Sequence, residues 1–287
     1  MRTGSGACSF VDLHSHSTAS DGAATPESVI ESAVRAGLSA IALTDHDTLS
    51  GVRAAQAAAA AAQSGLRVVP GVELSTMDGD REVHVLGLHI ATVEAMETEL
   101  ASFRGSRRTR AEEIVGKLNA LGVPITAAMV FAESGEGAVG RPHVARALIA
   151  GGWVRDQREA FDRYLGAGRP ANVEKAKISI ADGVRMIHSH GGLDIHAHPG
   201  PDGRRELVEP LVALGIDGLE VRHPGHGAED IRRIAALVEF LGLVPSGGSD
   251  WHGATAGPRV LGGMKVPAQF LELQDARLAQ RAAATTA

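Results

Sequence analysis

The chain has 287 residues, with 28 Lys or Arg against 34 Asp or Glu, so its formal net charge is −6 with the 13 His neutral. This length suits a (β/α) barrel or two domains. The acidic balance and the lack of a long basic run argue against a large surface for duplex DNA.

The N-terminal segment and the single cysteine bear on the cellular location. Residues 1–9 lack the apolar core of a signal peptide, and no run of 18 apolar residues occurs in the sequence. Cys8 has no second cysteine with which to form a disulfide, which suits a reducing compartment. We therefore expect a cytoplasmic protein without membrane association, and no feature of the sequence indicates an obligate protein partner.

Short apolar, β-branched segments alternate with longer Ala-, Leu- and Glu-rich segments, a pattern typical of parallel strands joined by crossover helices. The predicted class is therefore α/β. The first four predicted strands are Phe10–His14, Ala40–Thr44, Arg67–Gly71 and Val83–Leu88. Glu27–Ala36 is predicted to be a helix, with Thr25 as its N-cap, Pro26 at its start and Gly37 at its end. Ala54–Ala62 is predicted to be a second helix.

The pattern changes after the fourth strand, because residues 92–175 show helical spacing and almost no strand signal. The predicted helices of this region are Glu97–Leu121, Ala127–Glu133, Pro142–Ala150 and Asp156–Leu165. Pro124, the Gly135–Gly140 loop and the Gly166–Pro170 turn separate them. We interpret 92–175 as an inserted helical subdomain that caps the substrate pocket, since barrel insertions at the C-terminal face usually cover the active site.

Three further strands follow the insertion. They are predicted at Leu193–Ala197, Gly218–Val221 and Val244–Gly248. Residues 1–91 and 176–287 would then form one barrel domain of seven strands around the inserted subdomain.

Potential metal ligands recur where the first three strands end. His14-Ser15-His16 leaves the first strand, and side chains two residues apart in extended backbone point to the same face. By itself this pair is equally compatible with two surface histidines. Asp21 follows it, His46 follows the second strand within Thr44-Asp45-His46-Asp47, and Glu73 follows the third.

The later strands repeat this pattern. His84 lies in the fourth strand, His196 and His198 lie at the end of the fifth, and Asp250 and His252 follow the seventh. His84 or His196 alone could be a histidine of the core, but chance does not explain so many coincidences. Imidazole and carboxylate ligands together suit Zn, Mn or Fe(II), and their number exceeds what one ion uses.

In this order the motifs resemble the PHP (polymerase and histidinol phosphatase) family, which is related to the amidohydrolases. The motifs are His14-Ser15-His16, Asp21-Gly22, Thr44-Asp45-His46-Asp47, Gly71-Val72-Glu73, Val83-His84, Ala197-His198-Pro199 and Gly248-Ser249-Asp250-Trp251-His252. The resemblance implies a distorted (β/α)7 TIM-like barrel and two or three divalent ions of Mn, Fe or Zn. It assigns one ion to His14, His16, Glu73 and Asp250, a second to the bridging Glu73 with His84 and His198, and a third to Asp21, His46 and His252.

The motif order and the helical insertion are most similar to the family's small phosphoesterases, including nucleoside 3′,5′-bisphosphate phosphatases and enzymes that trim RNA 5′ ends. In these an Arg that begins an insertion helix binds phosphate, and Arg141 in Arg141-Pro142-His143 matches it. A second Arg follows His-Pro-Gly in that group. Here Pro201 stands in its place, and Arg204 or Arg205 is the candidate substitute.

The resemblance also implies the chemistry. We expect hydrolysis of a phosphate monoester on a small nucleotide-like substrate, with a hydroxide that bridges the metals as nucleophile. Asp250 would act through the metals, Arg141 would bind the phosphate oxygens and His143 would orient the substrate or protonate the leaving group. His223 could contact substrate or a ligand carboxylate, or be structural. For Arg141 the alternative is a surface charge at a helix start.

Two other functions stay open. The same site could cleave a phosphodiester or remove nucleotides from short RNA in the 5′-3′ direction. A metal-binding regulatory module without turnover is disfavoured, because every ligand position holds a competent residue. Asp78, Asp80, His188, His190 and the tail after Gln274 are expected to lie on the solvated surface.

Overall fold

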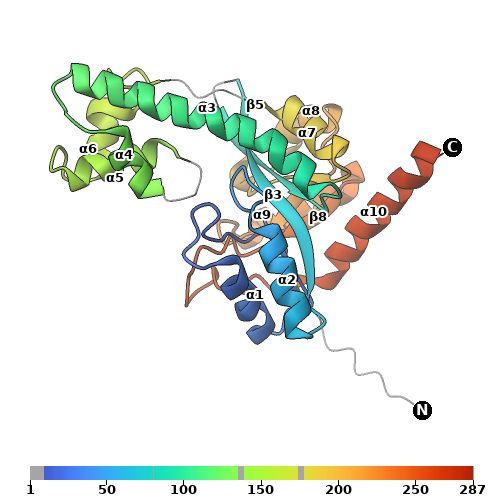
Figure 1. Cartoon of the computed structure of the whole chain (residues 1–287). Helices are drawn as coiled ribbons and strands as arrows, with labels where there is room; N and C mark the ends of the chain where they lie inside the picture. The colour runs from blue at the N-terminus through green and yellow to red at the C-terminus, as the bar shows by residue number, and fades with distance from the viewer. Residues whose placement is uncertain (1–9, 80, 135–138, 174–177, 287) are drawn as a thin grey trace, which may run out of the picture. The chain divides into compact units, whose positions relative to one another are not determined.

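The computed structural model describes residues 10–79, 81–134, 139–173 and 178–286 (Figure 1). Cys8, Asp80, most of the predicted Gly135–Gly140 loop and the predicted boundary at 175/176 lie outside the described residues. The chain divides into two compact units, Met1–Glu97 with Ile178–Ala287 and Thr98–Lys177. Among the described residues, the helices are too short or too polar to cross a membrane.

The larger unit is built on a barrel-like sheet. Its strands are β1 (Phe10–Asp12), β2 (Ala40–Leu43), β3 (Arg67–Asp78), β4 (Arg81–Leu88), β5 (Ile178–Ser179), β6 (Leu193–His196), β7 (Gly218–Arg222), β8 (Val244–Gly247) and β9 (Val266–Pro267). They are ordered β8-β7-β6-β4-β3-β2-β1-β9, and β5 pairs with β3. The sheet curves back on itself, because Leu13 N donates to Gly247 O at 3.0 Å and Ser15 forms a parallel bridge with Trp251. The predicted TIM-like barrel is thus confirmed.

Helices follow most strands of this unit. They are α1 (Pro26–Arg35), α2 (Val52–Ala62), α7 (Ile180–Ser189), the short 3-10 helix η2 (Gly200–Asp202), α8 (Arg205–Ala213), α9 (Ala228–Leu241) and α10 (Ala268–Thr286). Helix α1 begins as predicted, since Thr25 Oγ1 accepts a hydrogen bond from Ser28 N at 3.3 Å. Gly37 has φ +70°, the left-handed conformation that ends helices.

The expectation of parallel strands throughout is wrong for β3 and β4. These two strands form an antiparallel hairpin from Gly71 paired with Leu88 to Asp78 paired with Arg81, and β4 is also antiparallel to β6. The prediction ended the third strand at Gly71, but the strand continues to Asp78, which pairs with Arg81. Gly79 follows in the turn with φ +60°, a conformation that tight hairpin turns require and that glycine adopts readily.

The core of the barrel consists of inward-facing aliphatic side chains from several strands. Val11, Leu13, Leu86, Leu88 and Ile195 are fully buried in one cluster. Leu271 of α10 packs on the same cluster, so this C-terminal helix is part of the folded unit. Burial of such side chains is the main stabilising contribution to the barrel that carries the site.

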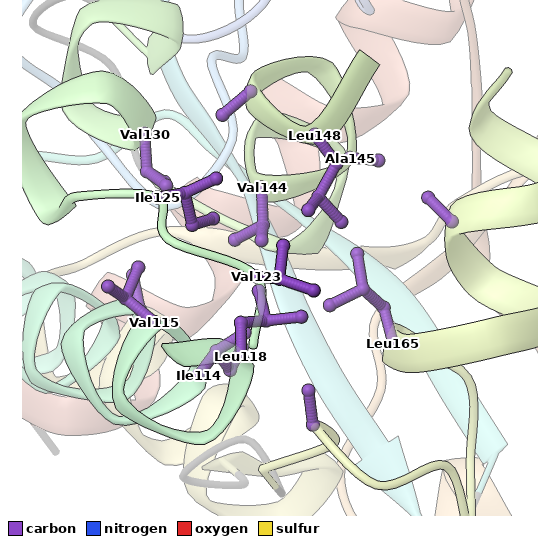
Figure 2. Packing of buried hydrophobic residues seen from close by; sticks show 14 of the residues in the cluster. Ile114, Val115, Leu118, Val123, Ile125, Val130, Val144, Ala145, Leu148 and Leu165 are labelled. Carbon is purple, nitrogen blue, oxygen red and sulfur yellow. The ribbon is translucent and has the colours of Figure 1, made fainter. Parts of the chain in front are cut away.

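The smaller unit is helical, as predicted. It contains most of α3 (Val93–Ala120), α4 (Ala127–Ser134), α5 (Arg141–Ala150), α6 (Gln157–Ala160) and the π-helix η1 (Phe161–Leu165). The predicted helix Asp156–Leu165 is therefore a short α-helix that continues as a π-helix. Figure 2 shows the core of this unit, where Ile114, Leu118, Val144 and Leu148 pack together. The unit has its own hydrophobic core, which suits an inserted subdomain.

Candidate metal centre

Carboxylate and imidazole side chains from several strands meet in the larger unit. His14 and His16 follow β1, His46 follows β2, and Asp250 follows β8. Glu73 and His84 lie within the β3–β4 hairpin, and His198 follows β6. All nine predicted ligands take part in this cluster: His14, His16, Asp21, His46, Glu73, His84, His198, Asp250 and His252.

Glu73 lies at the centre of the cluster and is 1% exposed. Its Oε2 atom is 3.2 Å from His14 Nε2, 3.2 Å from His16 Nε2 and 3.3 Å from His46 Nδ1. Its Oε1 atom is 2.8 Å from His84 Nδ1 and 3.1 Å from His198 Nε2. The two carboxylate oxygens therefore face different histidines.

Asp250 and Asp21 complete the ligand groups. Asp250 Oδ1 lies 3.5 Å from His14 Nε2 and 3.3 Å from His16 Nε2. Asp21 Oδ1 lies 3.2 Å from His252 Nε2, and Asp21 Oδ2 lies 3.8 Å from His46 Nε2. Within this cluster, three sets of described residues have donor atoms within 4.8 Å of one another: His14, His16, Glu73 and Asp250; His16, Asp21, His46 and His252; and His46, Glu73 and His84.

The chemistry of His16 supports a cation at this place. His16 is fully buried, its Nδ1 has no hydrogen-bond partner among the described residues, and its Nε2 lies 3.2 Å from Glu73 and 3.3 Å from Asp250 without good hydrogen-bond geometry. Buried polar atoms are nearly always satisfied, so such nitrogens indicate a missing partner. A divalent metal that takes nitrogen and oxygen donors fits this requirement.

The buried carboxylates make the cluster strongly attractive to cations. Burial by itself would lower the pKa of His14, but the negative charges of Glu220 and Glu73 raise that pKa well above its usual value. Burial likewise opposes protonation of His16, whereas Asp250 and Glu73 raise its pKa to about 9. Protons and metal ions therefore compete for these nitrogens.

Glu220 of β7 supports two of the ligands and is fully buried. Its Oε1 is 3.0 Å from His14 Nδ1, and its Oε2 accepts a hydrogen bond from His198 N at 2.7 Å. This contact leaves His14 Nε2 for the cluster. Glu220 was not among the predicted site residues. A carboxylate inside a predicted buried strand is unusual, and this could have indicated a functional role.

Two aspartates beside His46 fix the loops that carry the ligands. Asp45 accepts hydrogen bonds from Ser17 N and Ser17 Oγ at 2.7 Å each, and from Ser20 Oγ at 2.7 Å. Asp47 accepts from Ser75 N and Ser75 Oγ at 2.9 Å each. These bonds join the loop after β1 to β2, and the end of β2 to β3.

The backbone is strained where two ligands leave their strands. Asp250 has φ +49° and His198 has φ +32°, a region that residues other than glycine rarely adopt. Gly248 is required for a different reason: a Cβ atom there would collide with the backbone and Cβ of His14. Such close approach brings the end of β8 against the end of β1.

The predicted substrate residues Arg141 and His143 lie at the start of α5 in the smaller unit. Arg141 Nη1 donates to Leu165 O at 3.2 Å and to Asn172 Oδ1 at 3.4 Å. His143 Nδ1 accepts a hydrogen bond from Gly140 N at 2.9 Å and thereby caps the helix. Both residues therefore also have structural contacts, and their substrate roles stay predictions.

Arg204 and Arg205 have partners of their own. Arg204 Nε donates to Pro201 O at 2.7 Å. Arg205 Nε donates to Glu209 Oε1 at 2.7 Å, and its guanidinium lies 4.9 Å from the centre of the Phe240 ring. Among the described residues, neither arginine forms a hydrogen bond or an ion pair with the cluster around Glu73, so their substrate role stays a prediction.

His223 and Arg259 lie at the edge of the cluster. His223 Nε2 is 3.3 Å from Asp250 Oδ2, and Arg259 Nη1 is 2.5 Å from the same oxygen. The contact of His223 with a ligand carboxylate was one of the open possibilities. Arg259 was missed, because nothing in its local sequence relates it to Asp250.

Much of the tail after Gln274 is half-buried or exposed, as expected, but His188 is only partly exposed and contacts two buried carboxylates. His188 Nε2 is 2.8 Å from Asp194 Oδ2 and 3.1 Å from Asp217 Oδ2. Arg281 of α10 lies 3.1 Å from Asp217 Oδ2 through its Nη1 atom. The tail forms a helix whose basic residues reach a second buried acidic cluster.

Comparisons with known proteins agree with this geometry. The model of the PHP domain matches residues 12–127. The chain is 39% identical to a 3′,5′-nucleoside bisphosphate phosphatase of Chromobacterium violaceum, over 88% of this chain and 90% of that one. It is 36% identical to a 5′-3′ exoribonuclease of Haemophilus influenzae, over 84% of this chain and 89% of that one.

A solved structure gives the same result for the fold. A Bifidobacterium adolescentis chain whose structure carries the description metal-dependent phosphoesterase superposes with a TM-score of 0.76 at 30% sequence identity, covering 94% of this chain and 97% of that one. The motifs, the barrel and the cluster of histidines and carboxylates agree with these similarities. The chain belongs to the PHP-domain family and is a metal-dependent phosphoesterase.

Proposed function

We propose that the chain hydrolyses the phosphate monoester of a small nucleotide-like substrate, such as a nucleoside 3′,5′-bisphosphate. The observation that carries the proposal is Glu73. One of its oxygens lies 3.2 Å from both His14 Nε2 and His16 Nε2, and the other lies 2.8 Å from His84 Nδ1 and 3.1 Å from His198 Nε2. A carboxylate with this arrangement is suited to bridge two cations.

The proposed ligand sets follow from these contacts. One ion would be held by His14, His16, Glu73 and Asp250, a second by Glu73, His84 and His198, and a third by Asp21, His46 and His252. Mn, Fe or Zn in such sites would lower the pKa of water and neutralise charge that develops on the phosphoryl oxygens. The protein residues hold the ions, and Glu220 fixes the orientation of His14.

The substrate class is supported by the similar proteins, which include a nucleoside bisphosphate phosphatase. The exoribonuclease relative makes cleavage of a phosphodiester, or 5′-3′ removal of nucleotides from short RNA, the second candidate. A regulatory module without turnover is disfavoured, because every ligand position holds a competent donor. The cytoplasm is the proposed location, since Cys8 is the one cysteine of the sequence.

The helical subdomain completes the proposal. Residues 92–175 would cap the substrate, with Arg141 binding phosphate oxygens and His143 orienting the substrate or protonating its leaving group. His223, beside Asp250, would contact the substrate at the edge of the metal cluster. Arg204 and Arg205 stay weaker candidates, because each already has a partner.

A substrate panel tests the proposed function. Protein loaded with Mn, Fe or Zn is assayed for phosphate release from nucleoside 3′,5′-bisphosphates, cyclic diesters and short 5′-phosphorylated RNA. We expect the bisphosphates to give the highest kcat/KM and chelation to abolish it. A clear preference for RNA would favour the second candidate, and turnover of none of these compounds would contradict both.

The role of Arg141 can be separated from the metals. Arg141→Ala should keep its metal content but lose about 10²-fold or more in kcat/KM, the scale of a lost charge-assisted bidentate contact. The kcat/KM of Arg141→Lys should lie between those of wild type and Arg141→Ala, since an ammonium restores the charge but not the planar fork of the guanidinium. Kinetics close to wild type in Arg141→Ala would leave Arg141 with only its bonds to Leu165 and Asn172.

A further inference from the structure

Arg259 belongs to the segment that follows His252 and precedes β9. Its Nη1 atom donates to Asp250 Oδ2 at 2.5 Å and approaches Asp250 O at 3.4 Å. The Arg259 side chain is 49% exposed, whereas the Asp250 side chain is 16% exposed. A solvent-accessible guanidinium therefore lies directly against a carboxylate of the ligand cluster.

The two oxygens of Asp250 have different surroundings. Oδ1 faces His14 Nε2 and His16 Nε2, at 3.5 Å and 3.3 Å. Oδ2 faces His223 Nε2 at 3.3 Å and Arg259. A cation held with His14 and His16 would take the Oδ1 side. Arg259 then lies on the Oδ2 side of the same carboxylate, so that only Asp250 separates it from the proposed metal position.

Arg259 keeps most of its hydrogen-bonding capacity. A guanidinium carries five N–H donors, and the contacts of Arg259 with the described residues involve Nη1 only. The Nε and Nη2 donors are left for a ligand or water. Two such donors in a planar fork match two oxygens of a phosphoryl group.

Other arginines of this unit are engaged elsewhere. Arg233 donates to Gly200 O and Gly203 O, and Arg81 donates to Asp202 Oδ2. Arg222 donates to main-chain carbonyls of the segment before β9. Of the arginines in the described part of the larger unit, Arg259 is the one that bonds to a residue of the cluster around Glu73. Its charge would offset the repulsion between the cluster carboxylates and an anionic ester.

We propose that Arg259 is a substrate-binding residue that holds non-bridging oxygens of the phosphoryl group beside Asp250. This inference rests on the proposed phosphoesterase function of the same site. Its salt bridge with Asp250 would keep the guanidinium in position, while the free edge of the fork binds the phosphate. Arg259 would thus contribute to affinity for any phosphorylated substrate, whatever its base.

The experiment compares wild type, Arg259→Gln, Arg259→Lys and the control Arg35→Gln. Arg35 is an exposed residue of α1 that pairs with Glu31 and Ser32, away from the cluster. Each Mn-loaded protein is titrated with inorganic phosphate by calorimetry, and metal content and steady-state kinetics on a phosphate monoester are measured in parallel. We expect Arg259→Gln to bind phosphate about 10- to 100-fold more weakly and to raise KM by a similar factor.

Metal content should be unchanged in both Arg259 variants, Arg259→Lys should recover part of the phosphate affinity, and Arg35→Gln should match wild type. An unchanged phosphate Kd in Arg259→Gln would overturn the proposal. So would reduced metal content with normal phosphate affinity per loaded protein, since Arg259 would then only position Asp250. The proposed function fails separately, if wild type hydrolyses no ester while phosphate binding still depends on Arg259.

Discussion

The larger unit contains two buried clusters of carboxylates and histidines, at opposite ends of the same strands. Glu220 and His198, at the C-terminal ends of β7 and β6, belong to the cluster around Glu73, which is the proposed metal cluster. Asp217 and Asp194, at the N-terminal ends of β7 and β6, belong to the second cluster with His188. The donor atoms of His188, Asp194 and Asp217 are close enough to one another to hold a cation.

The partners of the carboxylates distinguish the two clusters. In the second, Arg281 lies 3.1 Å and Arg277 3.8 Å from Asp217, so α10 supplies permanent positive charge. In the metal cluster Glu73 is surrounded by histidines. Buried carboxylates need cationic partners. The second cluster therefore has arginine partners for its carboxylates, whereas the carboxylates of the first have mainly histidine partners, which suit metals.

The largest expected effect comes from removing the charge of Glu73. Glu73→Gln should lower both metal content and kcat, the latter by at least about 10²-fold, because a neutral amide does not bridge two cations. Elemental analysis and steady-state kinetics measure both. The matched control is Asp194→Asn in the second cluster, which should keep its metal. Equal metal stoichiometry in wild type and Glu73→Gln would remove the bridging assignment.

A smaller effect is expected when an orienting carboxylate is changed. Glu220→Gln keeps the shape but weakens the bond to His14 Nδ1, so metal affinity should fall about 10- to 100-fold. Competition with a fluorescent chelator measures this affinity. If the metal affinity of Glu220→Gln equals that of wild type, the contact between Glu220 and His14 is structural and does not influence metal binding by His14.

The second cluster should respond in stability and not in activity. Arg281→Ala leaves Asp217 and Asp194 buried with fewer cations, and we expect the free energy of unfolding to fall by about 2 kcal/mol. Urea denaturation measures it, with metal content as the readout that should not move. Arg277→Ala, with the longer distance to Asp217, should cost less. Loss of metal in Arg281→Ala would contradict the view that the second cluster contributes to stability and not to metal binding.

Within the second cluster we also expect a pH dependence of stability from His188. Asp194 and Asp217 raise the pKa of His188 to about 9, and Arg281 opposes this. Because this pKa lies above the unfolded value of about 6.5, the contribution is complete below pH 6.5 and is lost as pH rises to 9. The stability difference between wild type and His188→Gln should shrink across that interval. A difference independent of pH would show that His188 is not charged there.

The sequence by itself determined the barrel class, the helical insertion and the set of residues that meet at the proposed metal site. These follow from local patterns: period-two strands, Thr25 and Gly37 at the ends of α1, and His or acidic residues where strands finish. The PHP motifs are short and ordered along the chain, so each proposed ligand could be chosen without knowledge of its spatial neighbours.

Only the tertiary structure decided which residues support those ligands and which charges need no metal. Glu220 reaches His14 across 206 positions, Arg281 reaches His188 across 93, and Arg259 reaches Asp250 across a loop without a regular pattern. Such contacts depend on the curvature of the sheet and on where α10 packs. The local sequence pattern does not predict these contacts, because side chains distant in sequence meet only when the barrel closes.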